Sequence, residues 1–203
     1  ARDNFERTLA SGWGTAQVGG NWSSVTGTSV SGGAGKISLT AGQTKAPTLS
    51  NASGANVSGR LVLSADKVAN GGGLHFNFLL HKSAAGDYRL KVRTLSTGAV
   101  TANLVKMVGT TETTLATRTL TGYTFTAGAK LQVAFETSVS GGTTTLRGSV
   151  WPDGTTQPGS WQLTANDTTA SLQAAGQVGV LAYLSGSTTN GPVVVSIDDL
   201  NVT

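Results

Sequence analysis

The 203-residue sequence contains no cysteine, which excludes three kinds of chemistry at once. Without cysteine there is no disulfide framework, no thiolate metal site and no cysteine nucleophile. Charged residues are also scarce: they make up 12% of the chain, about half of the usual share. Glycine, serine and threonine supply most of the polar character, with 28 glycines in the chain. Such a composition is typical of extracellular β-rich modules, so we expect an exported protein, secreted or held at the cell surface.

Acidic residues are the scarcest charged group, and their scarcity explains the basic character of the chain. The 14 Lys and Arg outnumber the 10 Asp and Glu, which gives a net charge of +4. No window has the clustered Lys and Arg of a nucleic-acid-binding arm. We therefore expect no nucleic-acid partner.

The sequence also lacks long apolar segments. No stretch reaches the ~20 apolar residues that cross a bilayer, so we expect no membrane insertion. Residues 1–3 do not begin a signal peptide, and the chain starts without Met. We expect a mature product or a part of a larger, multidomain secreted protein.

Helical periodicity is nearly absent, and short alternating runs take its place. Only residues 166–175 (NDTTASLQAA) have the cap, composition and glycine stop of a short helix. About ten alternating runs without crossover helices predict a single all-β domain over residues 1–203, an antiparallel sandwich of two sheets, expected to be a monomer. The runs are residues 37–41, 59–65, 73–82, 88–95, 100–108, 113–120, 130–138, 143–151, 177–184 and 193–202.

Alternation in the runs 73–82 and 88–95 assigns their two faces. A hairpin that places His81 opposite Arg89 puts the apolar residues of both strands on one face, as a packed core requires. In this register Asn77 lies opposite Arg93. The other face then carries a polar, basic set: His75, Asn77, His81, Arg89, Lys91 and Arg93.

The runs 130–138 and 143–151 give a second polar face. Their apolar residues are expected in the core, while Gln132, Glu136, Arg147 and Trp151 are expected to be exposed. An exposed Trp beside Arg and amide groups is typical of sugar recognition, because the aromatic face stacks on pyranose C–H groups. Large aromatics are usually mostly buried, so Trp13 and Trp22 are expected in the core.

Motifs at both ends of the sequence resemble a known type of module. D-x-F-x-R, G-W-G and G-G-x-W stand near the start, YRLKVR in the middle, and Y-L-S-G-S and P-V-x-V-S-I-D-D-L near the end. Together they resemble laminin G-like modules of secreted actinobacterial proteins. The resemblance implies a concanavalin A-like jelly roll whose first and last strands pair, which brings Asp3 close to Asp199.

The resemblance also implies a metal. Many modules of this fold hold one structural Ca²⁺ near the paired termini, where hard oxygen ligands suit it. The expected ligands are Asp3, Asp198 and Asp199. The alternative is that Asp199 only accepts backbone amides at the strand end. No organic cofactor is expected.

Two kinds of enzyme are known on this fold, and the residues fit each of them poorly. Hydrolases of this fold carry E-x-D-x-x-E on one strand, a motif that is absent here, and Glu136 is the only carboxylate expected in mid-strand on an exposed face. A polysaccharide lyase needs a base and cations, which His75, His81 and the basic set supply. However, Tyr88 is expected on the opposite face, and the motifs of alginate lyases are missing.

We therefore expect a non-catalytic module that binds a polysaccharide or other glycan on a concave sheet face. Arg89, Arg93 and Arg147 would donate hydrogen bonds, and Trp151 or Tyr183 would provide the stacking platform. A basic face favours acidic or otherwise acceptor-rich glycans. The alternatives are an adhesion or spacer module whose basic face is only solvated, and a lyase or hydrolase domain.

Overall fold

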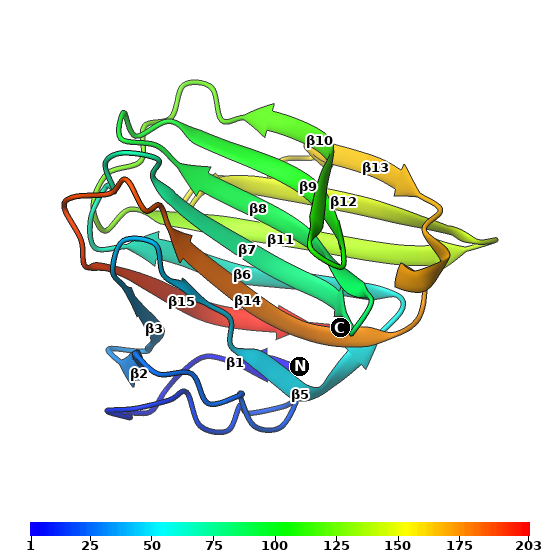
Figure 1. Cartoon of the computed structure of the whole chain (residues 1–203), viewed down its shortest axis with the longest axis horizontal. Coiled ribbons are helices and arrows are strands. Elements are labelled where there is room, and N and C mark those ends of the chain that lie inside the picture. The colour runs from blue at the N-terminus through cyan, green and yellow to red at the C-terminus, as the bar shows by residue number, and fades with distance from the viewer.

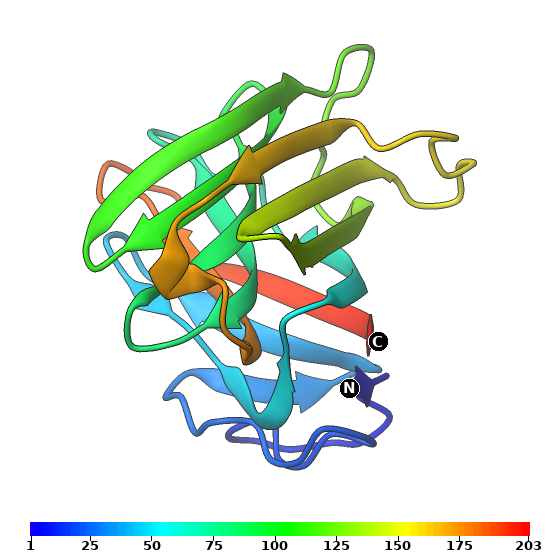
Figure 2. The ribbon, with the colours of Figure 1, turned by 90° about the vertical axis from the view of Figure 1, so that its right-hand side faces the viewer.

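The computed structural model describes the backbone of residues 1–203 and every side chain except that of residue 50. The strands form two antiparallel sheets that stack face to face, as Figures 1 and 2 show from two directions. Among the described residues no helix is long and apolar enough to span a membrane.

The sheet nearer the viewer in Figure 1, called the front sheet, has seven strands. Its order is β10 (Thr111–Thr119), β9 (Val100–Val108), β8 (Gly86–Thr94), β7 (Leu74–Lys82), β14 (Gly176–Leu184) and β4 (Thr44–Lys45), with β5 (Thr48–Gly54) also paired to β14.

The back sheet has eight strands. Its order is β13 (Leu163–Asp167), β12 (Thr143–Pro152), β11 (Lys130–Ser140), β6 (Val57–Ala65), β15 (Val193–Val202), β3 (Ala34–Leu39) and β2 (Thr28–Ser31), with β1 (Arg2–Asp3) also paired to β15.

All ten predicted strands are present, and the predicted helix is mostly wrong. Residues 163–167 form β13, and only Ala170–Leu172 form a single 3₁₀ turn. Strands β1, β2, β4, β5 and β13 were not predicted. Four of them have only two to five residues, and the seven-residue β5 lacks sustained apolar alternation. The predicted pairing of the termini is confirmed, since Asp3 lies opposite Leu200.

The core lies between the sheets, where the apolar faces assigned by alternation meet. Phe78 of the front sheet and Phe135 of the back sheet are fully buried, with ring centroids 6.3 Å apart. Gly59 on β6 leaves room for this contact, because an added Cβ would lie 2.5 Å from Cζ of Phe78. Burial of one such side chain contributes about 1.5–3 kcal/mol.

Aromatic rings of the N-terminal segment close the core beside β3. Trp13 packs edge-on against Phe5 at 5.2 Å and against Trp22 at 4.7 Å between centroids. All three rings are buried, so the prediction for Trp13 and Trp22 is confirmed.

A buried polar network ties the sheets together at the end of the core near β13. The Tyr88 hydroxyl donates to Oδ2 of Asp167 at 2.9 Å, and Nζ of Lys106 donates to Oδ1 at 2.5 Å. Burial alone would raise the pKa of Asp167, but hydrogen bonds from Lys106, Thr169 and Tyr88 hold that pKa at about 2. Burial raises the pKa of Tyr88 to about 12. The network therefore keeps a charged carboxylate inside the fold.

Candidate functional site

The outer face of the front sheet carries polar side chains in cross-strand rows. Asn77 lies opposite Lys91 on β8 and opposite Leu181 on β14. In the next row, His75 lies opposite Arg93 and Tyr183. These rows line a depression of about 320 Å³, which we call the sheet groove; its lining residues are Thr44, His75, Asn77, Arg89, Lys91, Glu112, Leu181 and Tyr183.

The hairpin between β9 and β10 forms one wall of the groove. Nζ of Lys91 lies 2.7 Å from Oε1 of Glu112, although the strand register places Lys91 in line with Asn103 and Thr117. Glu112 reaches Lys91 because the hairpin stands out in front of the sheet, as Figure 1 shows. The hairpin therefore turns a sheet face into a groove.

Asn77 forms the floor of the sheet groove and is only 2% exposed. Its Nδ2 donates to the carbonyl of Leu181 at 3.3 Å. Its Oδ1 accepts no hydrogen bond from any described group. The bond to Leu181 fixes the orientation of the amide, because a flipped amide would direct its oxygen at that carbonyl. A buried acceptor without a donor costs about 1–3 kcal/mol. Less than 1 Å² of this oxygen is exposed, so a ligand hydroxyl reaches it only when a neighbouring side chain moves aside.

His75 and Tyr183 form an aromatic side of the groove. Their ring centroids are 5.5 Å apart, and the rings are tilted by 53°. Burial, followed by the charges of Lys91 and Arg93, lowers the pKa of His75 to about 4. The imidazole is therefore neutral at physiological pH, and the two rings offer an uncharged surface on which a sugar ring can stack.

The cations of this face are already engaged. Arg89 forms an ion pair with Asp87 on the same strand, through Nε and through NH2 at 2.9 Å. Arg93 donates to the carbonyl of Gly72 at 2.9 and 3.1 Å. The pairs of Arg89 with Asp87 and of Lys91 with Glu112 offset two of these cations, whereas Arg93 keeps its charge.

The placement of His81 on this face was wrong. The hairpin register differs by two residues from the predicted one, since Leu79 and not His81 lies opposite Arg89. His81 has a positive φ of 56°, which turns its side chain into the interior. There its ring nitrogens contact the Thr137 hydroxyl at 3.0 Å and the Leu172 carbonyl at 3.1 Å. His81 is only 1% exposed and joins the two sheets.

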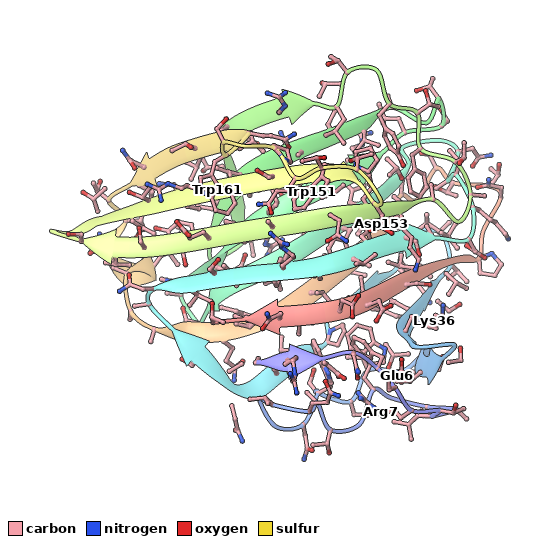
Figure 3. All side chains as sticks on the ribbon, turned by 180° about the vertical axis from the view of Figure 1, so that it is seen from behind. Glu6, Arg7, Lys36, Trp151, Asp153 and Trp161 are labelled. Carbon is pink, nitrogen blue, oxygen red and sulfur yellow. The ribbon has the colours of Figure 1, made fainter. Side chains whose placement is uncertain are left out.

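Arg147 and Trp151 belong to the opposite side of the molecule. Both lie on β12 of the back sheet, so they cannot act with Arg89 and Arg93. Trp151 was predicted to be exposed but is 5% exposed, because Arg60 stacks on its ring at 5.4 Å. The segment after β12 also runs across this strand in Figure 3, and its Gln157 accepts a hydrogen bond from Arg60. Arg147 pairs with Glu136 at 2.9 Å.

Five predicted residues line the sheet groove: His75, Asn77, Arg89, Lys91 and Tyr183. Arg93 lies beside the groove, in the same cross-strand row as His75. Thr44, Glu112 and Leu181 were missed. Thr44 belongs to a strand of two residues, and Glu112 reaches the groove only through the curl of its hairpin. Alternation places Leu181 on the same face as Tyr183. A single apolar residue on a polar face gave no reason to predict it as part of a binding site.

The expected calcium ligands do not fit a calcium ion as they are arranged. The Asp3 carboxylate is fully buried and accepts hydrogen bonds from Arg7 at 2.7 Å, twice, and from the Trp22 indole at 2.7 Å. Asp199 is exposed on a bulge with φ of 49°. Within the described part of the chain, no three acidic or His side chains converge on one point. Calcium binding stays a prediction that this geometry does not favour.

Comparisons with known proteins identify the fold. No protein-family model matches the chain, and no curated protein does. Among solved structures, the carbohydrate-binding module CBM66 from Bacillus subtilis is 13% identical, with a TM-score of 0.58 over 89% of this chain and 94% of that chain. Bacillus licheniformis β-glucanase is also 13% identical, with a TM-score of 0.60 over 100% and 97%.

A third structure, of endo-acting O-glycanases from members of the human gut microbiota, is 10% identical with a TM-score of 0.64 over 100% and 98%. This chain has the jelly-roll fold. At such low identity the likeness extends to the fold alone, and a binding module shares it with enzymes. The finer resemblance to actinobacterial laminin G-like modules stays a prediction.

Proposed function

We propose that this jelly roll is a non-catalytic carbohydrate-binding module that holds a neutral saccharide in the sheet groove. The observation that carries the proposal is the ring pair of His75 and Tyr183 in the groove, beside Asn77, whose Oδ1 is buried just beneath the floor without a donor. A sugar hydroxyl is the donor that this oxygen lacks, and the adjacent rings suit the C–H face of a pyranose.

The charge arrangement favours neutral over acidic glycans. A carboxylate is an acceptor, so it cannot satisfy Oδ1 of Asn77. It would also have to displace Glu112 from Lys91 or Asp87 from Arg89. A hydroxyl can donate to Asn77 and accept from these cations without breaking either pair. This revises the acidic preference expected from the sequence.

The fold and composition support the wider setting of the proposal. The jelly roll is shared with a carbohydrate-binding module and with glycan-cleaving enzymes. The low charge and high Gly, Ser and Thr content suit an extracellular module. We therefore propose secretion or surface display as part of a larger polysaccharide-associated protein.

Affinity electrophoresis in gels that contain soluble xylan, β-glucan, mannan, levan or alginate tests the proposal. We expect retardation by at least one neutral polysaccharide, and any retardation by alginate should be independent of the sheet groove. Tyr183→Ala should abolish the retardation, whereas Arg147→Ala on the back sheet should keep it. Mobility unchanged by every neutral polymer would favour the adhesion or spacer alternative.

A polysaccharide lyase is the second candidate, because the structure places a tyrosine beside the neutral His75. Their ring centroids lie 5.5 Å apart on the same face, whereas Tyr88 is buried in the core. A neutral imidazole is the form that accepts a proton. Incubation with alginate or another polyuronate, followed by absorbance of the unsaturated product, tests this activity. Turnover that disappears in His75→Gln would replace the non-catalytic proposal.

A further inference from the structure

A second depression opens at the edge of the sandwich, well away from the sheet groove in the fold. It lies where the segment after β10 meets the end of β12, and it has a volume of about 210 Å³. We call it the edge cleft. Its polar residues are Arg118, Thr121, Tyr123 and Gln162, and its apolar ones include Leu120, Trp151 and Pro152.

The polar side chains of the edge cleft keep donor groups that no described group accepts. Gln162 uses its Oε1 to accept from the Val150 amide at 2.8 Å, which leaves its Nε2 free. Neither the Arg118 guanidinium nor the Tyr123 hydroxyl has a hydrogen bond or an ion pair to another described group. Arg118, Tyr123 and Gln162, each with an unused donor, therefore line one small cleft.

The charge of the edge cleft differs from that of the sheet groove. Its lining includes the Arg118 cation and no carboxylate. In the sheet groove, by contrast, Lys91 and Arg89 both pair with acids. A ligand for the cleft must bring acceptors, and one negative charge would complement Arg118.

The apolar part of the cleft sets the shape of the ligand. Burial raises the pKa of Tyr123, as expected for a phenol packed in a concave, partly apolar place. Leu120 and Pro152 continue this apolar surface. The volume is below the about 300–1,000 Å³ of pockets for drug-sized ligands, so a single ring fills it.

We propose that the edge cleft is a second carbohydrate site, specific for a sugar ring that carries a carboxylate, such as a hexuronate unit. Arg118 binds the carboxylate, Tyr123 supplies the ring contact and its hydroxyl, and Nε2 of Gln162 donates to a ring hydroxyl. The site is independent of the sheet groove, which takes the neutral part of a glycan.

Two-dimensional ¹⁵N NMR of the whole chain tests this inference, with methyl β-D-glucuronide and methyl β-D-glucoside as probes. We expect the glucuronide, but not the glucoside, to shift the amides of Gly122 and Tyr123. Arg118→Gln should weaken glucuronide binding at least about tenfold, since a charge-assisted contact is lost. Arg147→Gln and Asn77→Leu should leave it unchanged.

The outcomes separate this inference from the proposed function. Glucuronide shifts at His75 and Tyr183 instead of Gly122 would show that the acidic sugar uses the sheet groove, and would overturn the second site. If Arg118→Gln has the Tm of the wild type and the Gly122 shifts persist unchanged in it, the second site is also overturned. The absence of any glucuronide-induced shift would overturn the second site as well. None of these results bears on neutral saccharides in the sheet groove.

Discussion

Lys91 on β8 and Glu112 on β10 are joined by an ion pair of 2.7 Å that spans the intervening strand β9. The pair holds the β9–β10 hairpin over the sheet and neutralises a cation beside Asn77. Both the position of the hairpin wall and the neutralisation of Lys91 in the sheet groove therefore depend on this one ion pair.

Glu112→Gln is expected to loosen this wall. The pair is partly exposed, with Glu112 at 39%, so its loss should cost about 0–1 kcal/mol of unfolding free energy. Hydrogen exchange at residues 108–112 should speed up, and neutral-glycan affinity should fall. Arg147→Gln, which breaks the comparable pair with Glu136 on the back sheet, serves as the control. Equal effects of both variants on affinity would contradict the role of the wall.

Asn77→Leu should separate binding from stability. The substitution removes the free acceptor but also the bond to Leu181, so the unfolding free energy should change by no more than about 1 kcal/mol. Neutral-glycan binding should be lost, because no group remains to accept the sugar hydroxyl. Asn103→Leu, on the same face but bonded to Thr117, should bind normally. Urea titration and calorimetry measure the two quantities.

The face of Asn77 was predictable from alternation, whereas its neighbours depended on the exact register. Alternation places residues on one face or the other, so His75, Asn77 and Lys91 were correctly grouped. It does not reveal a residue such as His81, whose positive φ reverses its direction because the core offers partners there.

Alternation also does not say which sheet a face belongs to. Arg147 and Trp151 have the right pattern for an outer face, but strand order puts them on the back sheet. Nor does a local pattern predict the curl that brings Glu112 to Lys91, since that follows from how the hairpin sits on the whole sheet.

The pH dependence of binding should follow His75. Its pKa of about 4 lies below the ordinary value of 6.5, so the neutral form persists until the pH falls to about 4. Neutral-glycan affinity should be constant from neutral pH down to about 5 and decline below, as a third charge develops beside Lys91 and Arg93. His75→Gln should remove this decline. An NMR titration of His75 with a midpoint near 6.5 would contradict the account.

Acid stability should depend on Asp167. Its folded-state pKa of about 2 lies below the value of 3.8 for a free carboxyl, so its ionised form stabilises the fold above about pH 4. That contribution, about 2 kcal/mol, is lost as the pH falls through 2. Urea titrations should show Asp167→Asn less stable than wild type at pH 7, with the gap narrowing toward pH 2. A gap independent of pH would mean that the carboxylate is not held charged.

Asp3 should behave as a structural anchor for the N-terminal segment. Asp3→Asn leaves the Arg7 guanidinium without its carboxylate and should cost about 3–5 kcal/mol. Asp199→Asn, at an exposed position, should cost much less. Added Ca²⁺ should not raise the Tm of the wild-type protein; a Ca²⁺-dependent rise that Asp199→Asn removes would establish the calcium site instead.

The most direct test of the central claim is an NMR titration with a neutral oligosaccharide, taken from a polymer that retards the protein. The signals to follow are the two ¹H–¹⁵N cross-peaks of the Asn77 side-chain amide. We predict that these two cross-peaks and the backbone amide cross-peaks of His75 and Tyr183 shift together with one binding constant. The side-chain cross-peaks of Asn103 should not shift. Saturable binding that leaves the Asn77 amide unchanged would contradict the sheet groove as the saccharide site.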